Sequence, residues 1–145
     1  MGREDELIER VRLACRDEPR PEHFTDYGHC CECAEHDATL RDAAPETIGL
    51  AELGNPGWDP ICFVTPAGFR YYLPALARLA LGRGEAYYLG QFLFHLRSGR
   101  VAELTSAQRA AVLALLEHVD ATMREETDGS SDGAALDEVM LTLMQ

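Results

Sequence analysis

The stretch TSAQRAAVLALLEHVDATM, residues 105–123, decides the fold class of this chain. It opens with Thr105 and, three residues later, Gln108, the spacing of a capping box at a helix N-terminus. Apolar residues then recur three and four positions apart, which is the period of one helix face. The members of this face are Val112, Leu115, Leu116, Val119 and Met123. The stretch therefore predicts a long amphipathic helix that buries one side in a core.

The same helical spacing recurs on both sides of this stretch. Residues 7–15, 29–42, 88–99 and 134–145 each carry apolar residues at helical intervals, and residues 49–54 resemble one short helical turn. Thr65 followed by Pro66 is typical of an N-cap and first helical position, which predicts a further helix up to Gly82. We therefore predict a single compact all-α domain of about six helices over residues 1–145.

Two segments interrupt the helical pattern. NPGWDP, residues 55–60, predicts a turn, and the apolar run 61–64 predicts a short extended piece in an irregular centre. A single run of this kind forms no sheet, because a strand needs a partner. The Gly- and Ser-rich residues 128–133 predict a flexible linker before the last helix.

The composition excludes several classes of protein. The chain has 145 residues, of which 46% are hydrophobic and 26% charged, as in an ordinary globular domain. Its net charge of −12 opposes nucleic-acid binding, which needs cations to neutralise phosphates. The central residues 60–102 carry five arginines and one acid, whereas both flanking regions are acidic. This layout is typical of acidic outer helices that pair with a basic centre, and it also favours a basic protein partner.

The cysteines and the N-terminus indicate the compartment. Five cysteines, three of them within residues 30–33, do not match the even, spaced set of a secreted disulfide framework. The first residues, MGREDEL, lack the apolar region of a signal peptide, and no apolar stretch is long enough to span a bilayer. We therefore expect a cytoplasmic protein without a membrane-spanning segment, whose thiols are free or metal-bound.

The segment HCCECAEH, residues 29–36, carries the chemistry that stands out most. Thiolate and imidazole are zinc ligands, and residues three and four apart on a helix are neighbours. The candidate metal ligands are Cys30, Cys33, His29 and His36, with Glu32 on the same face. A fourth position would come from Cys62, His23 or water. Zinc is the expected ion because it suits mixed thiolate–imidazole ligation.

Two other interpretations of these cysteines stay open. Cys30 and Cys33 can form a dithiol–disulfide pair near a helix N-terminus, although Glu32 opposes thiolate formation there. Alternatively, they are small apolar core residues on a helix face that offers few larger ones, with His29 and His36 in solvent.

A second segment, FRYYLPA at residues 69–75, combines arginine with tyrosine. Arg70 and Arg78 are eight residues apart and lie roughly on one helix face. With Tyr71 and the helix N-terminus near Thr65 they form a candidate face for an anion or a partner. The alternative is that both arginines pair with the acidic helices. No phosphate-binding loop and no serine–base set occurs, so we predict no catalytic residue.

The region from His29 to Leu81 resembles a family of small uncharacterised bacterial proteins that is classed as a domain of unknown function. The resemblance rests on H-C-x-E-C at residues 29–33, NPGWDP at residues 55–60 and FRYYLPA at residues 69–75. It implies a bacterial source and supplies no activity or cofactor. Two classes of function therefore stay open: a non-catalytic interaction module, such as an adaptor or immunity-type protein, and a zinc-binding or thiol-redox protein that uses residues 29–36.

Overall fold

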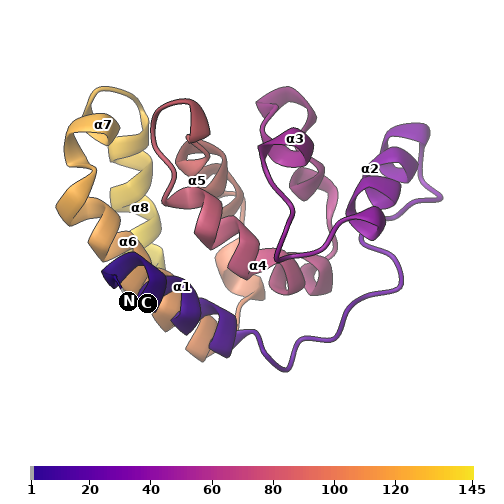
Figure 1. Cartoon of the computed structure of the whole chain (residues 1–145), viewed down its shortest axis with the longest axis horizontal. Helices are drawn as coiled ribbons and strands as arrows, with labels where there is room; N and C mark the ends of the chain where they lie inside the picture. The colour runs from indigo at the N-terminus through magenta and orange to yellow at the C-terminus, as the bar shows by residue number, and fades with distance from the viewer. Residues whose placement is uncertain (1) are drawn as a thin grey trace.

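The protein is built from helices alone in residues 2–145, the part that the computed structural model describes. The helices follow one another along the longest axis of the molecule, with α6, α7 and α8 at one end and α2 at the other (Figure 1). The elements, with 3₁₀ helices marked η, are α1 Arg3–Ala14, α2 Cys31–Asp42, α3 Leu50–Leu53, η1 Pro56–Trp58, η2 Pro60–Phe63, α4 Pro66–Ala80, η3 Gly84–Ala86, α5 Leu89–Arg97, η4 Arg100–Glu103, α6 Ser106–Thr122, α7 Arg124–Asp128 and α8 Asp132–Met144.

The start signals of the two longest helices act as predicted. Thr105 accepts a hydrogen bond from the backbone N–H of Gln108 at 3.1 Å, and Gln108 accepts one from the N–H of Thr105 at 3.0 Å. This reciprocal pair is the predicted capping box. At the start of α4, the hydroxyl of Thr65 accepts from the N–H of Gly68 at 3.1 Å. Each cap satisfies backbone donors that the helix itself leaves free.

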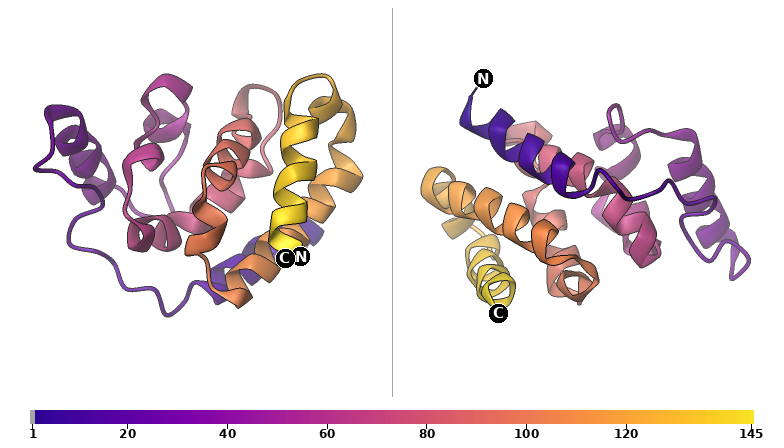
Figure 2. Two further views of the ribbon diagram at one scale, coloured as in Figure 1. Left: turned by 180° about the vertical axis from the view of Figure 1, so that it is seen from behind. Right: turned by 90° about the horizontal axis from the view of Figure 1, so that it is seen from below.

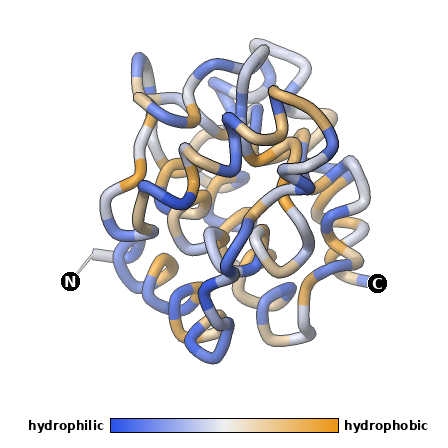
Figure 3. Tube along the Cα trace, turned by 90° about the vertical axis from the view of Figure 1, so that its right-hand side faces the viewer, coloured by the Kyte–Doolittle hydropathy of each residue, from blue (hydrophilic) through white to orange (hydrophobic). Residues whose placement is uncertain are grey.

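The core is one continuous cluster with large contributions from α4, α5 and α6. Their apolar faces bury residues such as Leu73, Phe92 and Leu115 completely. Helix α1 packs against α4 and α6, and α8 packs against α5 and α6. Seen from two further sides, α2 stays at the end away from α6–α8 (Figure 2). Hydrophilic and hydrophobic residues are interspersed along α1, the coil next to the N label in the trace coloured by hydropathy, as expected of a helix with one apolar face (Figure 3).

The all-α prediction is confirmed, and the helix count is higher than the expected six because two short helices, α3 and α7, form separate elements. The extended piece predicted at residues 61–64 is wrong. Pro60 to Phe63 form η2 instead, because the Asp59 carboxylate accepts from the N–H of Ile61 at 3.0 Å and Pro60 supplies a preset helical φ. Only Val64 is extended, in an isolated bridge with Thr25.

The predicted linker 128–133 is shorter in the structure. Asp128 ends α7 and Asp132 begins α8, so residues 129–131 make the turn between them. The flexibility of this segment stays a prediction. In the described residues, no helix has the length and the apolar character needed to cross a membrane.

Candidate functional site

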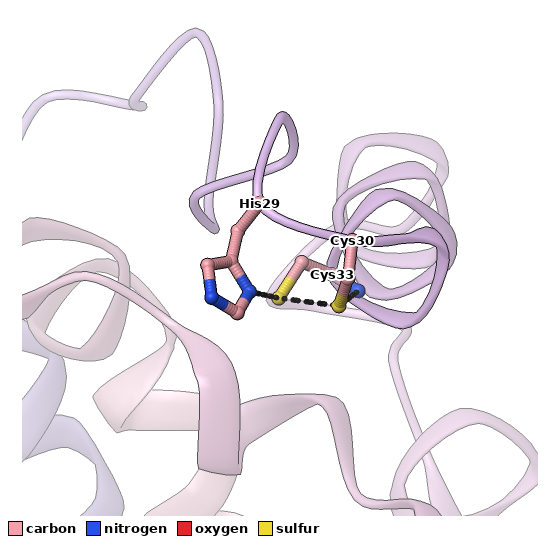
Figure 4. Close-up of side chains that lie close together, drawn as sticks. All are labelled: His29, Cys30 and Cys33. Atoms are coloured by element: carbon pink, nitrogen blue, oxygen red, sulfur yellow. Dashed lines mark hydrogen bonds between the residues drawn. The ribbon is translucent and has the colours of Figure 1, made fainter.

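The cysteine cluster forms where the chain enters α2. The helix begins at Cys31, so Cys30 is its N-cap residue rather than a residue of its first turn. The Sγ atom of Cys30 accepts a hydrogen bond from the backbone N–H of Cys33 at 3.4 Å, which replaces the hydroxyl or carboxylate of a usual N-cap (Figure 4). The helix start therefore holds this sulfur in place.

Three of the predicted ligands come together at this helix start. The Sγ atoms of Cys30 and Cys33 are 3.4 Å apart, and Nδ1 of His29 lies 3.8 Å from Sγ of Cys33 (Figure 4). All three ligand atoms lie within 4.8 Å of one another. His29 and Cys30 are exposed, whereas Cys33 is buried. The cluster thus has one closed side, formed by the protein, and one open side toward solvent.

The loop before α2 is anchored by Asp37, which faces the core side of the helix. Its Oδ1 accepts from the backbone N–H groups of Phe24 at 2.6 Å and Thr25 at 3.2 Å. The hydroxyl of Thr25 donates to the carbonyl of Cys33 at 2.6 Å. No role for Asp37 was predicted from the sequence, although an acidic residue on the apolar side of a helix indicates that hydrogen-bond donors meet it there.

The environment separates the two thiols. The N–H of Cys33 and the imidazole of His29 lower the pKa of Cys30 to about 7. The pKa of Cys33 is raised instead, chiefly because Cys30 hydrogen-bonds to it and carries the first negative charge. Burial and the carboxylates of Asp26 and Glu32 raise the pKa of Cys33 further. The thiolate of Cys30 also raises the pKa of His29. The pair therefore releases its first proton from Cys30, on the exposed side.

His36, which is the fourth candidate ligand and lies on α2, does not join the cluster. Its ring is fully buried and stacks on Phe63, with ring centroids 4.7 Å apart, and tilts against Trp58 at 4.6 Å. Both ring nitrogens are sealed from solvent without a hydrogen-bond partner among the described residues, although Nε2 lies 3.5 Å from Oε1 of Glu32. The aromatic contacts hold this ring between η1, η2 and α2, so it is not available to an ion beside Cys30.

The two residues expected to bring in a fourth ligand are also engaged elsewhere. Nδ1 of His23 lies 2.7 Å from Oδ2 of Asp37. The ring of His23 stacks on that of Tyr27, with the ring centroids 3.8 Å apart. Cys62 lines a separate cavity beside α5. The open side of the cluster therefore leaves a fourth position to water or to a ligand from another molecule.

The predicted arginine face is occupied by the chain itself. Arg70 donates to the Glu18 carboxylate at 3.1 Å and to the carbonyl of Glu103 at 3.0 Å. Arg78 donates to the carbonyls of Ile48 at 2.7 Å and Pro45 at 3.2 Å. A ligand at this face would have to compete with these contacts.

Tyr71, the third member of the predicted face, accepts a hydrogen bond from Arg20 at 3.2 Å. Arg20 lies in the loop between α1 and α2, and it also donates to the carbonyls of Arg41 and Ala43 at 2.8 and 3.1 Å. The hydroxyl of Tyr71 therefore helps to hold the end of α2 against α4.

Residues 3–138 match the profile of a family whose description reads "Family of unknown function (DUF6714)". A search of curated proteins finds no match to the chain. A search of solved structures finds none either.

Proposed function

The chain belongs to this family of unknown function, and we propose from its site that the protein binds one zinc ion through Cys30, Cys33 and His29. The ligand types support this proposal, because two thiolates and one imidazole match the preferences of zinc. The fourth coordination position is open to solvent.

The spacing of the three ligand atoms carries the proposal. At typical bond lengths, two sulfur ligands of a tetrahedral zinc lie about 3.8 Å apart, and a sulfur and a nitrogen ligand about 3.6 Å apart. The observed separations are 3.4 Å between the sulfurs and 3.8 Å between Nδ1 of His29 and Sγ of Cys33. Two of the three separations thus lie within a few tenths of an ångström of the tetrahedral values, and the third ligand pair, His29 and Cys30, lies within 4.8 Å.

The charges around the cluster also favour a cation. Two thiolates side by side repel each other, and the nearby carboxylates of Asp26 and Glu32 add to that repulsion. A divalent ion between the sulfurs removes it, since a bound cation is the largest local charge in such a site. The same carboxylates work against an isolated pair of thiolates, so the electrostatics support metal binding more than a free dithiolate.

Three protein ligands with one open position are typical of a site that exchanges its fourth ligand, whereas purely structural zinc sites are closed by four protein ligands. We expect zinc at this site to be exchangeable, and the fold to persist after its removal, because the core of α4, α5 and α6 does not involve these residues.

The test is equilibrium dialysis of the untagged protein against zinc, with elemental analysis of the retained metal. We expect one equivalent in the wild type, and binding reduced at least about tenfold in C30S and in C33S. C31S is the matched control, because Cys31 is exposed on the same helix and outside the cluster. Equal zinc retention by the wild type and C30S would refute the site.

A second candidate function, thiol–disulfide exchange, is supported by the asymmetry of the pair. Cys30 is exposed and Cys33 buried beneath it, with the sulfurs 3.4 Å apart. In such an exchange the Cys30 thiolate would attack a disulfide of another molecule, which forms a mixed disulfide and releases one partner thiolate. Cys33 would then attack the sulfur of Cys30, which forms the Cys30–Cys33 disulfide and releases the second partner thiolate. The partner disulfide would be reduced by two electrons as Cys30 and Cys33 become oxidised.

Titration against a glutathione redox buffer separates the two candidates. Reversible formation of a Cys30–Cys33 disulfide in the metal-free protein, seen as a mass loss of two hydrogens, would support exchange. The mass loss should be absent in C33S and retained in C31S. A pair that stays reduced across the buffer range would leave only metal binding. The expected basic protein partner and cytoplasmic location stay predictions, supported by the net charge of −12 and by the free thiols.

A further inference from the structure

A second candidate site is a cavity of about 450 Å³, and none of its lining residues belongs to the cluster of His29, Cys30 and Cys33. It is lined by residues of the segment from Gly54 to Cys62, by Tyr87 and residues of α5, and by Asp132 at the start of α8. Neither the proposed zinc site nor the thiol chemistry uses any residue of this cavity.

The lining of the cavity includes a buried hydrogen-bond network centred on Asp59. Its Oδ2 accepts from the hydroxyl of Tyr88 at 2.6 Å, from Nε2 of Gln91 at 2.9 Å and from Nε2 of His95 at 3.0 Å. Asp59 and His95 are each only 2% exposed. Although burial alone would raise the pKa of Asp59, these hydrogen bonds outweigh it and hold the pKa below its usual value. The carboxylate is therefore ionised in the folded protein.

This network settles which nitrogen of His95 carries a proton. Nε2 faces the Asp59 carboxylate, which only accepts, and the hydroxyl of Tyr88, which already donates to Asp59. Nε2 must therefore bear the hydrogen, so in the neutral ring Nδ1 carries the free lone pair.

The surroundings of Nδ1 of His95 follow from the contacts that it lacks. It makes no hydrogen bond within residues 2–145, and the sealed side-chain atoms without a partner there are both in His36. The small exposed area of His95 therefore includes Nδ1, and the cavity is the surface that His95 lines. This atom is an acceptor fixed in place and open to a ligand.

The lining of the cavity also combines negative charge with an aromatic ring. The Asp132 carboxylate accepts from the hydroxyl of Tyr87 and packs against Gly90, where a Cβ atom would lie 3.2 Å from its Oδ2. Phe94 lies one helical turn from Gly90 on α5, and its side chain is 57% exposed. In the described part of the chain no arginine lines this cavity, whereas two acidic residues, Asp59 and Asp132, do.

We propose that this cavity binds a small organic cation, an ammonium or amidinium group on an apolar body. Asp132 supplies the countercharge, the ring of Phe94 supplies an apolar and cation-attracting face, and Nδ1 of His95 accepts a hydrogen bond from the ligand. An anion of the same size is repelled by the two carboxylates and finds no guanidinium to pair with.

The test uses benzylamine as the probe and benzoate as its matched anion, each titrated into the full chain while the imidazole signals of His95 are followed by NMR. We expect saturable shifts with benzylamine, with a dissociation constant of about 1 mM as befits so small a ligand. Benzoate should bind at least about tenfold more weakly. Equal binding of the two, or no saturable shift with benzylamine, would overturn the proposal.

Two variants locate the bound probe. D132N, which keeps a partner for Tyr87, and F94A should each weaken benzylamine binding about fivefold. D137N and L141A are the controls, because both residues are exposed on α8 and neither lines the cavity. Circular dichroism of each variant checks the fold. An equal loss in D132N and D137N would show a general effect of charge and would refute binding in the cavity.

Discussion

The hydroxyl of Tyr88 donates a 2.6 Å hydrogen bond to Oδ2 of Asp59, 29 residues earlier in the chain. Through this bond the start of α5 holds the irregular segment between η1 and η2. The carboxylate satisfies four donors in all, since Oδ1 accepts from the backbone of Ile61 while Oδ2 accepts from Tyr88, Gln91 and His95. A turn predicted from NPGWDP is thereby fixed to the core by one buried negative charge.

Replacement of that charge should destabilise the protein. In D59N the amide keeps the shape of the side chain but loses hydrogen bonds to a charged acceptor, so we expect the free energy of unfolding to fall by about 2–3 kcal/mol at pH 7. Urea denaturation followed by circular dichroism measures this loss. The exposed substitution D137N should change it by no more than about 0.5 kcal/mol.

The loss in D59N should depend on pH in one direction. Because the pKa of Asp59 is lower in the folded than in the unfolded chain, its contribution is complete above about pH 5 and decreases as the pH falls through the folded pKa. The difference in unfolding free energy between wild type and D59N should therefore be constant from pH 5 to 7 and shrink below about pH 4. A difference that grows on acidification would contradict a lowered pKa.

Arg78 should contribute to stability rather than to ligand binding. Its guanidinium satisfies the carbonyls of Pro45 and Ile48, which would otherwise lose their partner at the half-buried junction of α2 and α3. We expect R78A to lower the free energy of unfolding by about 1–3 kcal/mol. R10A, at an exposed position of α1, is the control and should have little effect. An unchanged free energy of unfolding in R78A would contradict this structural role and would favour the predicted anion-binding role of Arg78.

His36 should be replaceable by an apolar ring. Its buried nitrogens have no hydrogen-bond partner in the described residues, so the side chain gains no polar interaction that would offset its desolvation. We expect H36F to keep the stacking on Phe63 and to stay within about 1 kcal/mol of the wild-type stability. Zinc retention should also be unchanged. Loss of zinc in a folded H36F variant would show that this histidine is a ligand.

Cys30 should be the most reactive thiol of the metal-free protein near neutral pH. With its pKa lowered to about 7, its alkylation by iodoacetamide should reach half of its maximal rate near that pH. Cys15, whose pKa is raised to about 12 by burial, should stay unmodified in the native chain. Peptide mass mapping after alkylation at several pH values identifies the modified residue. Preferential labelling of Cys33 would contradict the assignment.

The sequence predicted the parts of this protein that depend on neighbours in the chain. The helix starts at Thr65 and Thr105 follow from caps that act within three residues, and the apolar stripes follow from the 3.6-residue period. The grouping of His29, Cys30 and Cys33 is local as well, because a helix start brings such residues together in almost any context.

Other features were decided by contacts between distant segments. The 3₁₀ helix η2, which replaced the extended piece expected at residues 61–64, is capped locally by Asp59, but Asp59 itself is held in place by Tyr88, Gln91 and His95 about 30 residues later. Aromatic packing from η1 and η2 removed His36 from the ligand set, although its spacing on α2 made it a candidate. Arg70 was satisfied by Glu18, 52 residues away.

An all-α chain and a cluster of thiols at the start of one helix followed from local patterns, because capping, helical period and short spacing act between residues at most four positions apart. The contact of His95 with Asp59 across 36 residues, by contrast, depends on tertiary packing. That pairing is set by how α5 packs against the segment before α4, and no local pattern encodes which buried donor will meet which buried charge.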